Sequence, residues 1–206
     1  DYGDNNTYFP GANRNFMSGS NPASGFVYDT NETIMDVLDA KWGATITPIE
    51  NLNITGNVGY FLDNTREHVI MSPLYGSVKS NGGRASQESR RLSGLNLQFL
   101  GTYRRTFADV HHGDIMVGYE TYEQNQESVT AMGYHLYDPY NWAVSNTLND
   151  ENRKGSGAAV GYSTRGFFGR LNYDYDSRYF ASVSYRRDAS SHFHPDHRWG
   201  DFFSVS

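Results

Sequence analysis

Cysteine is absent from this chain of 206 residues, and long apolar runs and excess basic charge are missing as well. Without cysteine the chain can form no disulfide, no cysteine-ligated zinc site and no thiol nucleophile. No stretch approaches the roughly 18 apolar residues of a membrane-spanning helix, which excludes a helical membrane protein. The formal net charge is −6, so the chain has no basic stripe to neutralise phosphates, and nucleic acid is not an expected partner.

Aromatic residues, in contrast, are abundant. The chain has 16 Tyr and 12 Phe, while charged residues make up only 19% of it. A disordered chain would be poor in aromatic residues, so we expect a folded protein. The first residues, DYGDNNTYFP, contain neither the basic nor the apolar region of a signal peptide. We therefore expect that a leader has been removed or that the chain begins within a longer one.

The clearest pattern is the alternation of apolar and polar side chains near the C-terminus. Phe167, Leu171 and Tyr173 fall on one face of an extended chain, while Arg170 and Asn172 fall on the other. A period of two residues predicts a β-strand with one apolar and one polar face. A wall that is apolar outside and polar inside is what a membrane β-barrel requires.

The same alternation recurs along the chain and predicts six full strands and a seventh that begins at Trp199. Long polar loops are expected at 1–32, 64–88 and 124–157, and short connections at 48–51, 107–113 and 174–178. Short turns at one end and long loops at the other are typical of outer-membrane barrels. The expected strands exceed the usual five or six residues, which favours a membrane barrel over a soluble β-sandwich or propeller.

Three C-terminal runs also carry a specific motif. They are R-x-N-Y-x-Y-x-x-R-Y at 170–179, S-x-R-x-D-A-S-S-x-F at 184–193 and R-W-G-x-F-x-S-V-S at 198–206. Together they resemble the barrel of the SusC/RagA family of TonB-dependent transporters of the Bacteroidetes. The run WGATITPIENLNITGNVGY at 42–60 resembles the family's strand-Pro-turn-strand units more loosely. The chain departs from the family pattern at Ala189 and Phe203, where Gly and Pro are commoner.

The resemblance implies an all-β fold, an antiparallel transmembrane β-barrel segment in which residues 1–206 supply about seven strands. The family's barrel has about 22 strands, so seven cannot close it, and we expect one piece of a larger barrel. The plug domain and the TonB box are absent from these residues.

The resemblance also implies a function. We expect a bacterial outer-membrane importer of oligosaccharides or oligopeptides, embedded in the lipid bilayer, that is not an enzyme and needs no cofactor. Its implied partners are a SusD-like surface lipoprotein and TonB, the latter through the missing N-terminal part.

Two groups of residues are candidates for the site. Flat aromatic faces stack on sugar rings, so the loop 132–146 is the best candidate for ligand contact, through Tyr134, Tyr137, Tyr140 and Trp142. The alternative is that these aromatic side chains pack the loop or meet a partner protein. Polar strand residues are expected to face the barrel lumen, where they hydrate it or meet the plug: Asn53, Asn57, Asn96, Gln98 and Arg170.

Two other hypotheses remain open. One is a small structural or adhesive outer-membrane barrel complete in about eight strands. The other is a metal-dependent hydrolase, because the string from His192 through His194 to His197 matches the H-x-H-x-D-H motif of metallo-β-lactamase-fold enzymes. A polar run precedes this string instead of a buried strand, so we expect no catalytic metal there. The adjacent His111 and His112 are expected to point apart and to share no metal.

Overall fold

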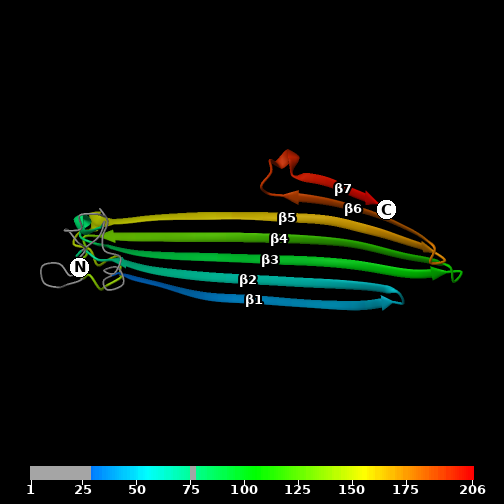
Figure 1. Ribbon diagram of the computed structural model, residues 1–206, viewed down its shortest axis with the longest axis horizontal. Coiled ribbons are helices and arrows are strands. Elements are labelled where there is room, and N and C mark those ends of the chain that lie inside the picture. The colour runs from blue at the N-terminus through cyan, green and yellow to red at the C-terminus, as the bar shows by residue number, and fades with distance from the viewer. Residues whose placement is uncertain (1–28, 75–77) are drawn as a thin grey trace, which may run out of the picture. The chain divides into compact units, whose positions relative to one another are not determined.

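The structure is a computed structural model that describes residues 29–74 and 78–206 (Figure 1). The strands are β1 (Thr30–Ile49), β2 (Leu52–Met71), β3 (Arg84–Phe107), β4 (His111–Tyr134), β5 (Arg153–Tyr175), β6 (Tyr179–Ser190) and β7 (Trp199–Val205). Three short 3-10 helices lie in the connections: η1 (Lys79–Asn81), η2 (Asp150–Asn152) and η3 (Pro195–His197). No helix in the described ranges is long and apolar enough to cross a membrane.

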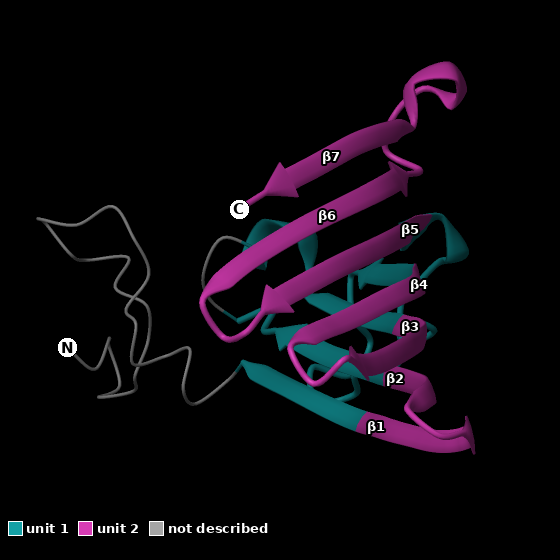
Figure 2. Ribbon diagram, turned by 90° about the vertical axis from the view of Figure 1, so that its right-hand side faces the viewer, with its two compact units in different colours: residues 1–36, 63–91, 127–159 teal, residues 37–62, 92–126, 160–206 magenta. Residues whose placement is uncertain are grey.

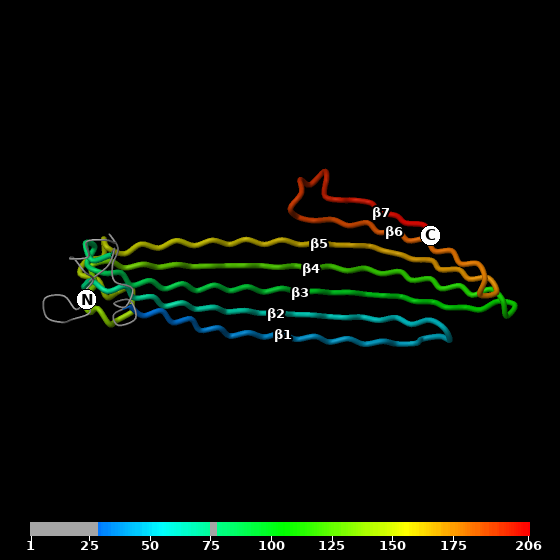
Figure 3. The backbone as a smooth tube through the Cα atoms, viewed as in Figure 1, coloured from blue at the N-terminus to red at the C-terminus, as the bar shows by residue number. Residues whose placement is uncertain are grey.

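The seven strands form one sheet in the order β1-β2-β3-β4-β5-β6-β7, so each strand pairs with its neighbours in the sequence. The strand β6 is antiparallel to both β5 and β7, and the chain can be followed through these three strands in Figure 3. In this register Asn172 lies opposite Ser182, and Arg186 lies opposite Phe202. A slip of one residue would move every side chain to the other face, so this register determines which residues meet.

The chain divides into two compact units (Figure 2). Unit 1 comprises residues 1–36, 63–91 and 127–159, and unit 2 comprises residues 37–62, 92–126 and 160–206. Strands β1 to β5 contribute a segment to each unit, whereas β6 and β7 belong to unit 2 alone. The buried apolar residues in the described part of the chain all lie in unit 1: Ile70, Ala85 and Leu136.

The predicted strand number and short connections are confirmed. The turn between β1 and β2 is Glu50-Asn51, and Asn51 adopts a left-handed backbone with φ 68°. The connections β3–β4 and β5–β6 have three residues each, at 108–110 and 176–178. The seventh strand begins at Trp199, as predicted.

The predicted long loops were wrong in extent. The strands run into all of them: β1 begins at Thr30, β2 reaches Met71, β3 begins at Arg84, β4 reaches Tyr134 and β5 begins at Arg153. The rest of the first predicted loop, residues 1–28, lies outside the described residues. Polar side chains occupy both faces of these strand ends, so the alternation of polarity disappears. The backbone hydrogen bonds between strands persist, because they do not depend on side-chain polarity.

Unit 2 exposes large apolar side chains on one face of its strands. Examples are Trp42, which is 67% exposed, Phe99 at 52% and Val117 at 58%. In β3 to β6 most of these residues hold the odd-numbered register, for instance Leu95, Ile115, Phe167 and Val183, whereas Val160 and Phe180 hold even-numbered positions. A continuous apolar face of this kind is too large for an ordinary water-exposed sheet and requires an apolar environment.

On the other face of unit 2, an aromatic ring packs directly over a glycine. A Cβ added at Gly118 of β4 would collide with the ring of Phe168 from β5 and lie 3.0 Å from Leu100 Cδ2 of β3. In contrast, a Cβ added at Gly101 of β3 would make an ordinary contact, 3.5 Å from Val117 Cγ2. Position 118 therefore has no room for a side chain larger than that of glycine, because the ring of Phe168 occupies the space.

We predict that Gly118→Ala destabilises the native protein by about 1–3 kcal/mol, because the ring of Phe168 must leave its position. The matched substitution Gly101→Ala should cost less than about 1 kcal/mol, because the same methyl group finds room there. Thermal unfolding of the purified full-length protein in detergent measures both. Equal losses in the two variants would contradict this account of the packing.

Candidate functional site

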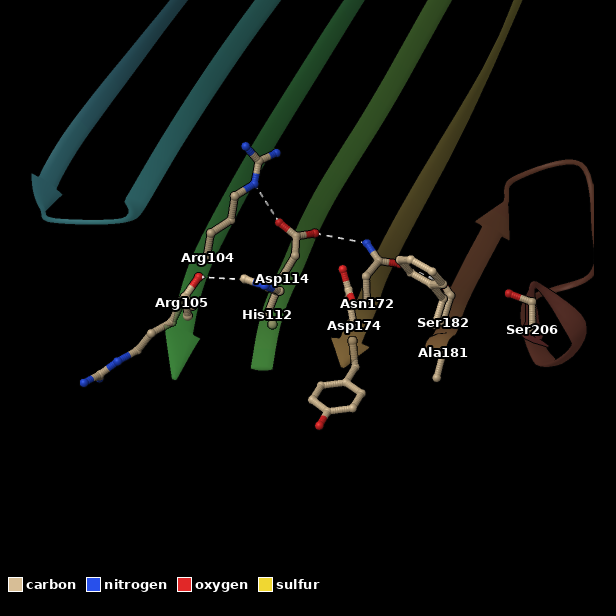
Figure 4. Close-up of a pocket in the computed structure, with 13 residues that line it drawn as sticks. Arg104, Arg105, His112, Asp114, Asn172, Asp174, Ala181, Ser182 and Ser206 are labelled. Carbon is tan, nitrogen blue, oxygen red and sulfur yellow. Dashed lines mark hydrogen bonds and ion pairs between the residues drawn. The ribbon is translucent and has the colours of Figure 1, made fainter. Parts of the chain in front are cut away.

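A row of polar side chains crosses four strands on the polar face of unit 2 (Figure 4). Arg104 of β3 donates from Nε to Asp114 Oδ2 of β4 at 2.9 Å. Asn172 Nδ2 of β5 donates to Asp114 Oδ1 at 3.1 Å, and Ser182 Oγ of β6 donates to Asn172 Oδ1 at 2.8 Å. These four residues, hereafter the polar row, satisfy one another's hydrogen-bonding groups from strand to strand.

A cavity of about 620 Å³ lies against the polar row. Its lining combines the row with Arg105, Thr106, His112 and Phe180, so it offers both charged and aromatic surface. His112 Nδ1 lies 2.9 Å from Thr106 Oγ1, which fixes the imidazole at the cavity wall. The volume suits a small ligand or an inserted peptide segment.

Further along the same face, Arg186 of β6 lies between two carboxylates. Its Nε donates to Asp188 Oδ2 at 2.6 Å, and its Nη2 pairs with Glu120 of β4. The guanidinium carbon also lies 5.4 Å from the ring centroid of Phe168. These residues form the Arg186 cluster, which carries one excess negative charge and borders a second cavity of about 500 Å³.

The five predicted lumen residues share the polar face of unit 2. Asn57 Nδ2 donates to Gln98 Oε1 at 3.0 Å, joining β2 to β3. Asn53 accepts a hydrogen bond of 2.8 Å from Thr47 Oγ1. Asn96 is exposed, and Arg170 lines a smaller cavity of about 250 Å³ beside Arg186. Their shared face is a structural result, whereas their orientation toward a lumen remains a prediction.

Sequence reasoning missed the polar row and the Arg186 cluster as connected groups. The signal that could have found them is the alternation itself, because Asp114, Glu120 and Arg186 all occupy even-numbered positions of β4 and β6. The pairing between strands was not visible in the sequence. It depends on the register, which joins residues as far apart as Glu120 and Arg186.

The four aromatic candidates for ligand contact are not brought together. Tyr134 is the last residue of β4, whereas the other three lie in the connection to β5. Trp142 stacks on His68 of β2, with ring centroids 4.1 Å apart and an interplanar angle of 4°. Tyr137 and Tyr140 are 81% and 72% exposed. Tyr137 and Tyr140 are thus the most exposed of the four, while Trp142 is 45% exposed with one ring face covered by His68.

This connection, residues 135–149, is an ordered loop held by Asn146. The Asn146 side chain is buried and donates to the carbonyl oxygens of Asp138 and Asn141 at 2.5 and 3.0 Å. Its Oδ1 accepts from the backbone N–H of Asp138 at 3.0 Å. Arg153 of β5 ties the loop again by donating from Nη2 to the carbonyl oxygen of Ser145 at 3.1 Å.

The histidines of the string are not placed to hold one metal ion together. His192 stacks on Tyr162 with ring centroids 5.0 Å apart, while the rings of His194 and His197 are 6.4 Å apart. Across residues 29–74 and 78–206, no three His, Asp or Glu side chains are placed to hold a metal ion. His111 and His112 face different partners, since His111 Nδ1 lies 2.6 Å from Tyr173 Oη and His112 bonds Thr106.

We predict that Asn172→Ala costs about 1–3 kcal/mol, because it leaves Asp114 Oδ1 and Ser182 Oγ without their partner in the polar row. Asn96→Ala is the matched control, because Asn96 lies on the same face and forms no side-chain hydrogen bond within the described residues. Chemical denaturation of the full-length protein in detergent compares the two. A loss for Asn96→Ala as large as that for Asn172→Ala would overturn the prediction.

Comparisons with known proteins place this arrangement in context. No protein-family model matches the chain. The chain is 22% identical over 191 residues to TonB-dependent receptor P26 of Formosa agariphila, and 24% identical over 189 residues to TonB-dependent receptor P3 of the same organism. The alignments cover 91% and 88% of this chain but 19% and 18% of the relatives. The chain therefore spans about a fifth of the curated relatives that it matches.

Solved structures show the same fold. The structure of the RagAB peptide transporter matches 97% of this chain with a TM-score of 0.84 and 21% identity, over 22% of the transporter chain. The RagAB peptide importer in the open-open state matches with a TM-score of 0.81, the same identity and the same coverage. TonB-dependent receptors sit in the bacterial outer membrane and are not enzymes, which agrees with the sequence predictions. In sequence and in fold, the chain corresponds to a segment of the barrel of a TonB-dependent receptor.

Proposed function

We propose that these residues are part of the barrel domain of a SusC/RagA-like importer that takes up oligopeptides or oligosaccharides. The observation that carries this proposal is the match of 97% of the chain to the RagAB peptide transporter at a TM-score of 0.84. Under this proposal, TonB supplies the energy and a SusD-like surface lipoprotein captures the substrate.

The two faces of unit 2 support a role as a barrel wall. The apolar face, with Trp42, Phe99 and Val117 exposed, suits contact with lipid tails. The opposite face carries the polar row and the Arg186 cluster, whose groups are paired with one another. Such a face suits a water-filled or plugged lumen, because its charges stay hydrated or paired there. We therefore assign Asn53, Asn57, Asn96, Gln98 and Arg170 to the lumen.

The RagAB structures are described as those of a peptide transporter and a peptide importer. This description favours oligopeptides as the substrate of the protein to which this chain belongs. RagAB is a two-component name, which supports a second protein that acts together with the barrel. The exposed Tyr137 and Tyr140 on the ordered loop 135–149 supply aromatic contact surface for the substrate or for this partner.

We predict that Leu95→Lys lowers the amount of folded protein in the outer membrane, because a charge on the lipid face of a barrel costs about 2–4 kcal/mol near the bilayer midplane. The adjacent Asn96→Lys should be tolerated, because Asn96 is exposed on the polar face. Heat-modifiable migration of the full-length protein from isolated outer membranes measures the folded fraction. Equal tolerance of both lysines would contradict the assignment of the two faces.

The decisive experiment for the proposed function is the intact mass of the native polypeptide, extracted from membranes in detergent. This chain has a mass of 23.3 kDa and matches 18–22% of the length of its relatives, so we expect a mass on the order of 100 kDa. A surface lipoprotein should co-purify with it. A membrane protein of about 23 kDa with heat-modifiable migration would instead establish the small self-contained barrel. A soluble protein of that mass with stoichiometric zinc, and an activity lost in His194→Ala, would establish the hydrolase.

A further inference from the structure

A cavity of about 370 Å³ lies in unit 1, where several strand ends and connections meet. Its lining comes from η1, the end of β4, η2 and the start of β5: Asn81, Tyr134, His135, Glu151, Asn152 and Lys154. Of the four aromatic candidates identified in the sequence, only Tyr134 lines it. The cavity is thus a more specific candidate for ligand contact than the loop as a whole.

The loop 135–149 folds over the other side of β4. A Cβ added at Gly133 would lie 2.6 Å from Thr147 Cγ2 and 2.8 Å from the carbonyl oxygen of Val144. The loop therefore occupies the space where a side chain at Gly133 would stand. Consecutive strand residues point to opposite faces, so Tyr134 points away from this part of the loop. The absence of a side chain at Gly133 lets the loop pack on one face and leaves the cavity on the other.

The backbone beside the cavity is held in an uncommon conformation. His135 has φ 56°, in the left-handed region that residues with a side chain rarely adopt. Hydrogen bonds compensate for it: His135 N–H donates to the Asn81 carbonyl at 2.9 Å, and Leu148 N–H donates to the His135 carbonyl at 3.0 Å. Gly82 makes room for the imidazole, because a Cβ there would lie 2.8 Å from His135 Nδ1. Such conformations cluster at binding and active sites.

The cavity presents two opposite charges that are not paired with each other. The ammonium group of Lys154 lies 5.7 Å from the ring centroid of Tyr134. Among the described residues, neither Lys154 nor Glu151 forms an ion pair, and the side-chain amides of Asn81 and Asn152 form no hydrogen bond. One cation, one anion and two amides are therefore available to a ligand in a single cavity.

We propose that this cavity is a subsite for a short oligopeptide, an inference that rests on the proposed function and names its substrate class. The carboxylate of the peptide pairs with Lys154, and its ammonium group or a backbone N–H binds Glu151. Asn81 and Asn152 bind backbone amides, which match side-chain amides as both donors and acceptors. A neutral sugar would displace water from the charged groups of Lys154 and Glu151 and would offer neither of them an opposite charge. Binding of a neutral sugar is therefore disfavoured.

Calorimetric titration of the full-length protein in detergent tests this subsite, with tri-alanine as the probe. Lys154 is exposed, and ion pairs of exposed side chains are weak. We therefore expect Lys154→Gln to weaken tri-alanine binding about two- to fivefold. Lys79→Gln is the matched control, because Lys79 lies in η1 next to Asn81 but does not line the cavity. It should leave the affinity unchanged.

Blocking the peptide carboxylate as an amide completes the test. The native protein should bind amidated tri-alanine about two- to fivefold more weakly, while Lys154→Gln should bind both peptides equally, because the pairing is already lost. Equal binding by Lys154→Gln and the native protein would overturn the subsite. If the binding of maltotriose depended on Lys154 as strongly as the binding of tri-alanine does, the assignment of a peptide ligand would be overturned.

The outcomes separate the subsite from the proposed function. If the full-length protein imports peptides and Lys154→Gln imports them equally well, the subsite is wrong and the importer stands. If the native polypeptide has a mass of about 23 kDa but shows Lys154-dependent binding of tri-alanine, the subsite stands and the importer is wrong.

Discussion

Backbone hydrogen bonding between neighbouring strands is the constraint on which the rest of this structure depends. Every strand pairs with the strands next to it in the sequence, and this pairing forces side chains to alternate between two faces. The edges of the sheet at β1 and β7 present unpaired N–H and C=O groups within the described residues. In hydrocarbon each such group costs several kcal/mol, so these edges need partner strands in a membrane. The proposal of a larger closed barrel meets this requirement.

The polar face of unit 2 shows how a barrel wall can carry charge at little cost. Asp114 uses its two oxygens for different strands, binding Arg104 of β3 and Asn172 of β5. Arg186 likewise engages carboxylates of β4 and β6. Because each group finds its partner on a neighbouring strand, these bonds also fix the register. A slip of one residue would turn Asp114 toward the apolar face, away from Arg104 and Asn172.

The sequence predicted the fold well where one face is apolar, and failed where both faces are polar. The alternation around Phe167 and Arg170 located β5, β6 and their turn correctly. It gave no signal at 64–71 or 124–134, because those strand ends carry polar side chains on both faces. Which site residues lie together in space was even harder to predict from the sequence. Tyr134 and Trp142 belong to the same sequence run, 132–146, yet one lines a cavity and the other stacks on His68. They are separated because the loop folds over one side of β4, and tertiary contacts determine which side that is.

The order within the loop 135–149 matters for binding. A flexible loop loses conformational entropy when it binds, and that loss weakens its affinity. Here Asn146 fixes three backbone groups, and Arg153 binds the loop again at Ser145 and Thr147. Tyr137 and Tyr140 are therefore exposed from a backbone that is already ordered. The loop also holds His135 at the cavity, because Leu148 N–H donates to the His135 carbonyl oxygen. Both surfaces therefore lose their conformational entropy when the protein folds. Binding at either surface causes little further loss, so this term no longer opposes it.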